Sequence, residues 1–141
     1  MLISTKSINL LSDNIRVSSE TFCSGLFLSA RWFVVSQLDY DGFQMIVLPD
    51  KDSAEYCAAD LYNLVEGDRI FFLPDSGKTL ERSNYKSTLG VQRTSAIGKI
   101  LEYEEGKLIV VTYPSALEEG IPDGKAINES VLHLTVGDEI S

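Results

Sequence analysis

The chain has few of the residue types from which metal centres and covalent catalytic sites are built. Its 141 residues include two cysteines, Cys23 and Cys57, and one histidine, His133. The cysteines lie in separate apolar segments without a C-x-x-C pair, so a zinc site is not expected, and a reduced, cytoplasmic setting fits better than a disulfide framework. A serine triad would need His133, but no G-x-S-x-G motif precedes it. The sequence therefore predicts no catalytic residue, no metal site and no cofactor.

Long hydrophobic runs are also missing. No segment approaches the roughly 20 apolar residues that cross a bilayer. The N-terminal residues, Met-Leu-Ile-Ser-Thr-Lys, lack the apolar core of a signal peptide. We therefore expect no membrane partner.

Positive charge is scarce, because 12 Lys and Arg residues stand against 21 Asp and Glu and give a net charge of −9. Phosphate contacts need clustered cations, so direct nucleic-acid binding is not expected. The charge is uneven, however, and residues 76–100 carry a local net charge of +4. These cations could form an anion-facing ridge, although a solvated loop and helix face is the commoner arrangement. The residues of this candidate interaction surface are Lys78, Arg82, Tyr85, Lys86 and Arg93.

The apolar residues that are present indicate a single α/β domain. The chain is 44% hydrophobic and 23% charged, which is typical of a globular domain with one core. Short apolar runs predict strands, and apolar residues at helical spacing predict helices between them, as in βαβ units. We expect an open, mainly parallel sheet with helices on both faces, spanning residues 21–141 after a lead-in segment 1–20 with a short helix. The predicted strands are 21–23, 45–48, 70–73 and 108–112, with a last one at 131–136, and the predicted helices are 28–38, 51–65, a third around 91–101, and 114–117.

The segment before the first helix of this domain resembles a phosphate-binding loop that has lost its chemistry. On the frame G-x-x-x-x-G-K-[ST], Gly25 fills the first glycine. Ala30 adds a Cβ where the backbone must approach a phosphate, and Arg31 replaces the compact lysine ammonium with a planar fork. Trp32 offers no oxygen to Mg²⁺. We interpret the segment as an eroded phosphate loop, and an ordinary strand–turn–helix start is the alternative.

Two alternative interpretations place a ligand site outside the segment 25–32 or at the ends of the strands. Ser-Gly-Lys-Thr at residues 76–79 spells the end of a phosphate loop, but the frame requires a glycine at Phe72. A small nucleotide hydrolase using Lys78 and Thr79 is the enzymatic alternative. A free-standing domain could instead bind a small anion at the carboxyl ends of the strands, in a pocket lined by Gly25, Asp50 and Pro74.

Several segments together resemble the N-terminal, UvrB-like module of the bacterial transcription-repair coupling factor. The first is Gly25-Leu-x-x-Ser-Ala30 before a helix, where this chain has Leu28 and Arg31 in place of the small residues common in that family. The others keep their order and spacing across about residues 20–141. They are residues 47–54 with Asp60-Leu61, 71–74, 91–94, 111–117 and 134–141.

The resemblance implies a degenerate relative of a helicase-type ATPase domain. In full-length members, a separate ATP-driven translocase pushes RNA polymerase stalled at a lesion, and the protein recruits the excision-nuclease A subunit, UvrA. We therefore expect this chain to be a non-catalytic fragment of a larger multidomain protein. Its expected partners are other domains of the same protein, with UvrA and RNA polymerase engaged through the full-length protein.

Overall fold

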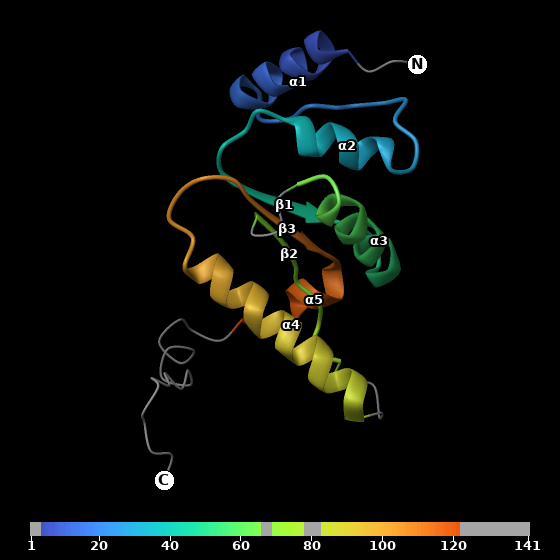
Figure 1. Cartoon of the computed structure of the whole chain (residues 1–141), viewed down its shortest axis with the longest axis vertical. Coiled ribbons are helices and arrows are strands. Elements are labelled where there is room, and N and C mark those ends of the chain that lie inside the picture. The colour runs from blue at the N-terminus through green and yellow to red at the C-terminus, as the bar shows by residue number, and fades with distance from the viewer. Residues whose placement is uncertain (1–3, 66–68, 78–82, 122–141) are drawn as a thin grey trace.

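The computed structural model describes residues 4–65, 69–77 and 83–121 of the chain, with residues 83–87 described as backbone only. Helices and strands alternate after the first two helices (Figure 1). The elements are α1 (Thr5–Val17), α2 (Ala30–Gln37), β1 (Phe43–Val47), α3 (Lys51–Tyr62), β2 (Ile70–Phe72), α4 (Ser83–Leu101), β3 (Leu108–Thr112) and α5 (Pro114–Glu118).

The three strands form one open parallel sheet in the order β1-β3-β2. The connection from β1 through α3 passes over the position of β3 to reach β2, and the connection through α4 then returns to β3. Because right-handed crossovers in opposite directions place their helices on opposite faces, α3 and α4 lie on either side of the sheet (Figure 1). This confirms the predicted α/β class with a parallel sheet and helices on both faces.

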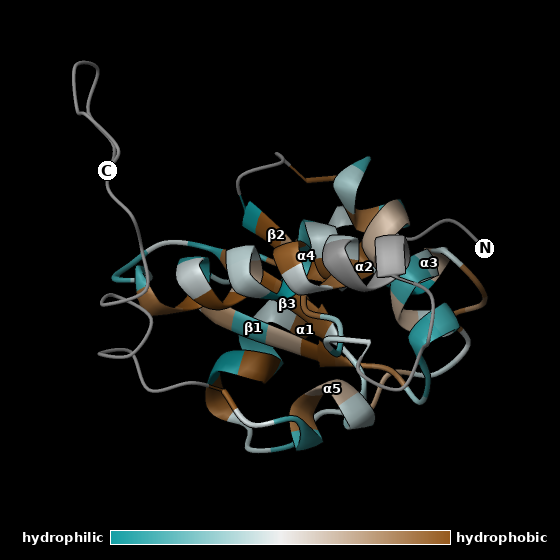
Figure 2. Cartoon of the chain, turned by 90° about the horizontal axis from the view of Figure 1, so that it is seen from below, coloured by the Kyte–Doolittle hydropathy of each residue, from teal (hydrophilic) through white to brown (hydrophobic). Residues whose placement is uncertain are grey.

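The core lies on both sides of the central strand β3. Ile109 and Val111 pack with α2 and α3, whereas Leu108 and Val110 pack with α4. Since successive side chains of a strand point to opposite faces, a strand covered on both sides must be apolar throughout. The hydrophobic colour accordingly gathers along the strands and the facing parts of the helices (Figure 2).

β1 departs from the expectation of a strand buried on both faces. Phe43, Met45 and Val47 are 36%, 44% and 50% exposed. They occupy the sheet face that α4 covers, but α4 lies over β2 rather than over β1. A continuous apolar run does not reveal whether its strand will be central or at an edge, and here it is at an edge.

The polar stretch 75–88 is partly helical, so the helix expected around 91–101 begins earlier than predicted. α4 begins at Ser83, and the first buried side chain described in it is Leu89. The N-terminal end of α4 extends past the sheet in Figure 1, so it needs no apolar stripe, and residues 83–88 have no apolar periodicity that would predict a helix. The strand expected at 131–136 lies outside the described residues.

Asp50 is the N-cap of α3, directly before the apolar-periodic segment that forms the helix. Its Oδ1 accepts the Ser53 backbone N–H at 2.8 Å, and its Oδ2 accepts the Ser53 hydroxyl at 3.0 Å. These hydrogen bonds, the backbone one first, lower the pKa of Asp50 below its ordinary value of 3.8. The capping hydrogen bonds therefore stabilise both the ionised form of the Asp50 carboxylate and the folded state.

We expect Asp50→Ala to lower the melting temperature above pH 4 by more than it does at lower pH. The pKa of Asp50 is lower in the folded than in the unfolded chain, so its contribution is complete above 3.8 and is lost as pH falls through the folded value. Thermal unfolding of both proteins between pH 2 and 7 measures this. Asp50→Asn, which still caps but does not titrate, is the control, and a gap independent of pH would contradict the assignment.

Cys57 is a buried thiol of α3, whereas Cys23 is exposed. Burial, with a smaller contribution from Asp60, raises the pKa of Cys57 to about 12. Because the thiolate is the reactive form, we expect a thiol reagent at pH 8 to modify one cysteine in the native protein and both in urea. Cys23→Ser should abolish the native reaction, and fast modification of both thiols in the native protein would contradict the burial of Cys57.

Candidate functional site

The segment 25–32 lies in the connection from α1 to α2, not after a strand. The expected strand 21–23 is absent, and Phe22 and Cys23 are exposed. An apolar run this short becomes a strand only where another strand pairs with it, and here it runs beside α1 instead. The structure thus lacks the strand–loop–helix context on which a phosphate loop depends.

The backbone of this segment uses its own N–H groups. The amide of Ala30 donates to the Phe27 carbonyl at 3.1 Å, and that of Arg31 donates to the Leu28 carbonyl at 3.4 Å. Gly25 and Leu28 have positive φ of 78° and 49°, and the left-handed Leu28 explains why α2 begins at Ala30 rather than at residue 28 as expected. A phosphate loop binds its anion with free amides, and two of those on the eroded frame are already hydrogen-bonded.

Arg31 and Trp32 contact each other. The guanidinium carbon of Arg31 lies 4.7 Å from the centroid of the Trp32 ring, and its Nε donates to the Leu28 carbonyl at 3.3 Å. Trp32 is buried in the core against α3, Val34 is buried beside the cavities near α1, and Phe33 is 42% exposed. The arginine therefore rests on a structural tryptophan.

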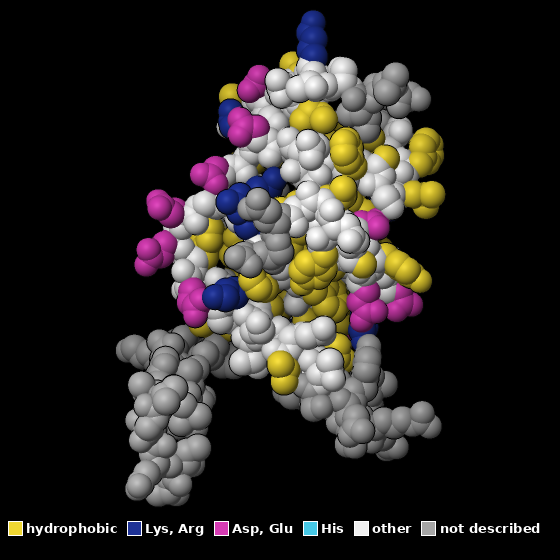
Figure 3. Space-filling model, viewed as in Figure 1, with side chains coloured by type: hydrophobic (Ala, Val, Ile, Leu, Met, Phe, Trp, Pro, Cys, Tyr) yellow, Lys and Arg dark blue, Asp and Glu magenta, His cyan; other side chains and the backbone are white. Residues whose placement is uncertain are grey.

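Large apolar side chains are exposed around this segment. Phe22, Phe27 and Leu28 are 87%, 80% and 82% exposed, and Leu10 and Val17 on α1 also face solvent. Figure 3 shows hydrophobic side chains over α1 and the connection to α2. A cavity of about 320 Å³ between α1 and this connection continues the apolar surface inward. Clusters of this kind mark contact surfaces more often than catalytic ones.

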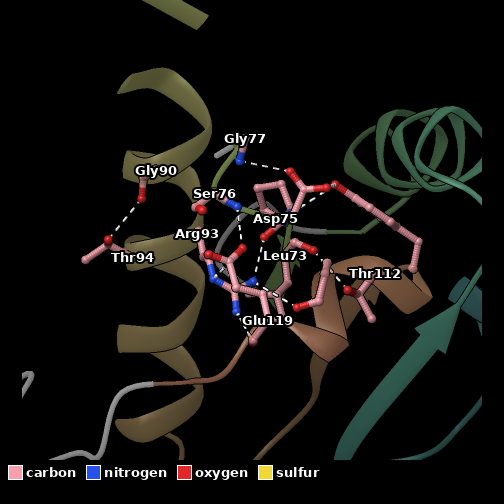
Figure 4. A network of polar contacts seen from close by, with 12 residues as sticks. Leu73, Asp75, Ser76, Gly77, Gly90, Arg93, Thr94, Thr112 and Glu119 are labelled. Atoms are coloured by element: carbon pink, nitrogen blue, oxygen red, sulfur yellow. Dashed lines mark hydrogen bonds and ion pairs between the residues drawn. The ribbon is translucent and has the colours of Figure 1, made fainter. Parts of the chain in front are cut away.

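A second site of interest lies at the carboxyl ends of β2 and β3, where open parallel sheets place their ligands. Arg93 of α4 is only 5% exposed there. Its Nη1 donates to the carbonyls of Pro74 and Ala116 at 2.7 and 3.0 Å, and its Nη2 donates to the Glu119 carbonyl at 2.7 Å. Figure 4 shows the guanidinium between the end of β2 and the end of α5. Arg93 is thus not part of an exposed ridge, which corrects its assignment to the candidate interaction surface.

The loop after β2 completes this network. The Asp75 amide donates to the Tyr113 hydroxyl, which in turn donates to Asp75 Oδ2, both at 3.0 Å. The Gly77 amide donates to Asp75 Oδ1 at 2.9 Å. The Ser76 amide donates to Glu119 Oε2 at 2.6 Å, and this oxygen lies 3.8 Å from Arg93 Nε. Side chains of the protein itself therefore fill the place of a ligand.

The remaining predicted residues are distributed over several parts of the chain. Lys78, Thr79 and Arg82 lie outside the described residues, and Tyr85 and Lys86 lie in the part of α4 described as backbone only. Gly25, Asp50 and Pro74 have different roles. Gly25 lines a cavity beside α1, Asp50 caps α3, and Pro74 is buried with its carbonyl bound by Arg93.

The sequence did not predict the network around Arg93, in which Glu119 pairs with Arg93 and Ser76, and Tyr113 pairs with Asp75. One signal for Arg93 was present, because it stands four residues from both Leu89 and Ile97, in the apolar stripe of α4. A charged residue within such a stripe must find partners in the interior. Its partners, by contrast, have no local signature.

Comparison of the chain with protein-family models, curated proteins and solved structures found no match. Over the described residues, the helices are too short or too polar to cross a membrane. The chemistry of the site therefore has to be inferred from its geometry.

Proposed function

We propose that this chain is a non-catalytic, UvrB-like module of a transcription-repair coupling factor, with a degenerate phosphate loop at residues 25–32. It acts by contacts with other domains of the same protein, and through the full-length protein it helps to couple stalled RNA polymerase to UvrA and excision repair. The observation that carries the proposal is that the amides of Ala30 and Arg31 are bound to the loop's own carbonyls at 3.1 and 3.4 Å.

The segments that carry the resemblance meet in space, which supports the proposal. Residues 71–74, 91–94 and 111–117 come together where Arg93 binds the carbonyls of Pro74 and Ala116. Segments that lie far apart in the sequence but form one buried network depend on one another for their packing. Their joint occurrence therefore supports the resemblance more strongly than any single segment does.

The exposed apolar residues supply the contact surface of the proposed module. Phe27 and Leu28 lie within the eroded loop and Phe22 precedes it, and all three are at least 80% exposed. Burying such side chains against a neighbouring domain contributes about 1.5–3 kcal/mol each. The surface around α2 is therefore the part of the chain that a second domain would cover.

Calorimetric titration with Mg-ATP tests the loss of nucleotide binding. We expect no heat of binding up to millimolar nucleotide, because the amides of Ala30 and Arg31 bind the loop's own carbonyls and Trp32 stands where the frame needs a hydroxyl for Mg²⁺. Heat of binding lost in Lys78→Ala, together with ATP turnover, would instead support a nucleotide hydrolase. Heat that is unchanged in Lys78→Ala would also contradict the proposal, because it would place nucleotide at another site.

Co-elution with the purified remainder of a coupling factor, and separately with UvrA, tests the contact surface. Phe27→Ser should weaken binding to the remainder of the coupling factor at least tenfold, since one buried aromatic is worth about 1.5–3 kcal/mol. Tyr56→Ser is the matched control, because Tyr56 on α3 is 76% exposed and lies outside this surface. Equal effects of the two substitutions, or no binding by the wild type, would contradict the assignment.

A further inference from the structure

Two donors converge on Oε2 of Glu119 at the carboxyl end of β2, the Ser76 amide at 2.6 Å and Arg93 Nε at 3.8 Å (Figure 4). The same residue, Ser76, also carries a buried hydroxyl. Arg93 is held in place independently of the Glu119 carboxylate, because the carbonyls of Pro74 and Ala116 bind its Nη1. The donors therefore form a preorganised cationic cradle at the sheet edge where α/β proteins bind ligands.

Glu119 satisfies this cradle only in part. The Ser76 amide reaches Oε2 at 2.6 Å, but Arg93 Nε lies 3.8 Å away, which is too far for a hydrogen bond. The Ser76 Oγ is buried and has no hydrogen-bond partner within the described part of the chain. Buried polar side-chain atoms are nearly always paired, so an unpaired hydroxyl on the residue whose amide binds the carboxylate indicates that these donors suit an acceptor with more oxygens.

We propose that Ser76 and Arg93 form an oxyanion-binding subsite that Glu119 fills as an internal substitute. The ligand class is a tetrahedral oxyanion such as phosphate, whose several oxygens can accept from the amide, the hydroxyl and the guanidinium at once. Glu119 follows α5 and its side chain is 20% exposed, so the carboxylate can turn outward without disturbing the sheet. The subsite is separate from residues 25–32 and does not depend on the proposed function.

The test is phosphate-dependent unfolding of Glu119→Ala, with Glu118→Ala as the matched control. Both variants remove one acidic charge, but Glu118 is exposed and lies outside the network. In sodium phosphate against sodium chloride of equal ionic strength, we expect Glu119→Ala to gain about 3–6 °C in melting temperature at tenfold excess over the Kd. The wild type and Glu118→Ala should gain less than a third of that. Acetate and ADP arms distinguish a carboxylate and a nucleotide phosphate from the free anion.

The NMR chemical shift of the Ser76 amide gives a second readout. A general effect of phosphate on protein stability would not change it. This chemical shift should change saturably with phosphate in Glu119→Ala. If that variant does not fold, Glu119→Gln replaces it, and phosphate should bind it at least tenfold more tightly than it binds the wild type, because the competing charge is gone. Equal responses of the Glu119 and Glu118 variants, or a Ser76 amide that phosphate leaves unchanged, would overturn the proposal.

Discussion

Replacing Arg93 by alanine is expected to lower the free energy of unfolding by about 3–5 kcal/mol. The guanidinium is 5% exposed and donates to the carbonyls of Pro74, Ala116 and Glu119. Its removal leaves these carbonyls without their donor and the Glu119 carboxylate without its buried counter-charge. Urea denaturation followed by circular dichroism measures the loss, which should appear as a lower midpoint at an unchanged slope.

Two further variants separate the network from the charge alone. Arg93→Lys keeps the positive charge but not the planar fork that reaches three carbonyls, so it should recover only part of the loss. Arg31→Ala removes an exposed arginine that rests on Trp32 and should cost about 1 kcal/mol or less. If Arg93→Ala proved as stable as Arg31→Ala, Arg93 would not be the buried centre of the network described above.

Replacing Leu61 by alanine is expected to cost about 2–5 kcal/mol. Leu61 of α3 is fully buried in the cluster that joins this helix to the sheet, where Ile70 and Ile109 are also 0% exposed. The loss combines the transfer free energy of the removed carbons with the cavity that the surrounding residues cannot fill. Urea titration with the same optical signal gives the difference.

Leu10→Ala is the matched control for Leu61→Ala. Leu10 lies on α1 and is 62% exposed, so the same chemical change should alter the free energy of unfolding by about 0.5 kcal/mol or less. A comparable loss at both positions would mean that α1 packs more closely than the structure shows. A small loss at both would instead place Leu61 outside the core.

The two places where this architecture could hold a ligand are closed in different ways. Around Ala30 the backbone amides bond to the loop itself, which removes the donors. At Ser76 the donors persist, and the carboxylate of Glu119 occupies them. Moving one side chain cannot free the amides around Ala30, whereas moving the Glu119 side chain would free the donors at Ser76. This difference is why a protein-contact role is proposed for the surface near α2 and an anion subsite for the end of β2.

Much of the fold could be predicted because its signals are local. The run 108–111 is apolar throughout because β3 is covered on both faces, and Pro114 begins α5 where a fixed φ suits a first helical turn. Asp50 stands directly before α3 and bonds to a residue three positions on. Helix α3 ends at Tyr62 rather than at residue 65, because Asn63 caps it by binding the Ala59 carbonyl.

The candidate site was less predictable because its contacts span long stretches of chain. Arg93 sits among cations in the sequence and was assigned to a solvated ridge, but the carbonyls it binds are 19, 23 and 26 residues away. The run 21–23 has strand composition, yet none of the described strands pairs with it. The residues next to Arg93 and next to the run 21–23 in the sequence indicate neither the burial of Arg93 nor the missing strand.

The sequence by itself determined the alternation of helices and strands, the apolar run that forms β3 and the cap of α3, since each depends on residues close to one another in the chain. Only the tertiary structure decided that β1 is an edge strand, that Arg93 is buried, and that Glu119 occupies the donors at Ser76. Strand order and ion pairing depend on which distant segments meet when the core closes, and local composition does not specify those partners.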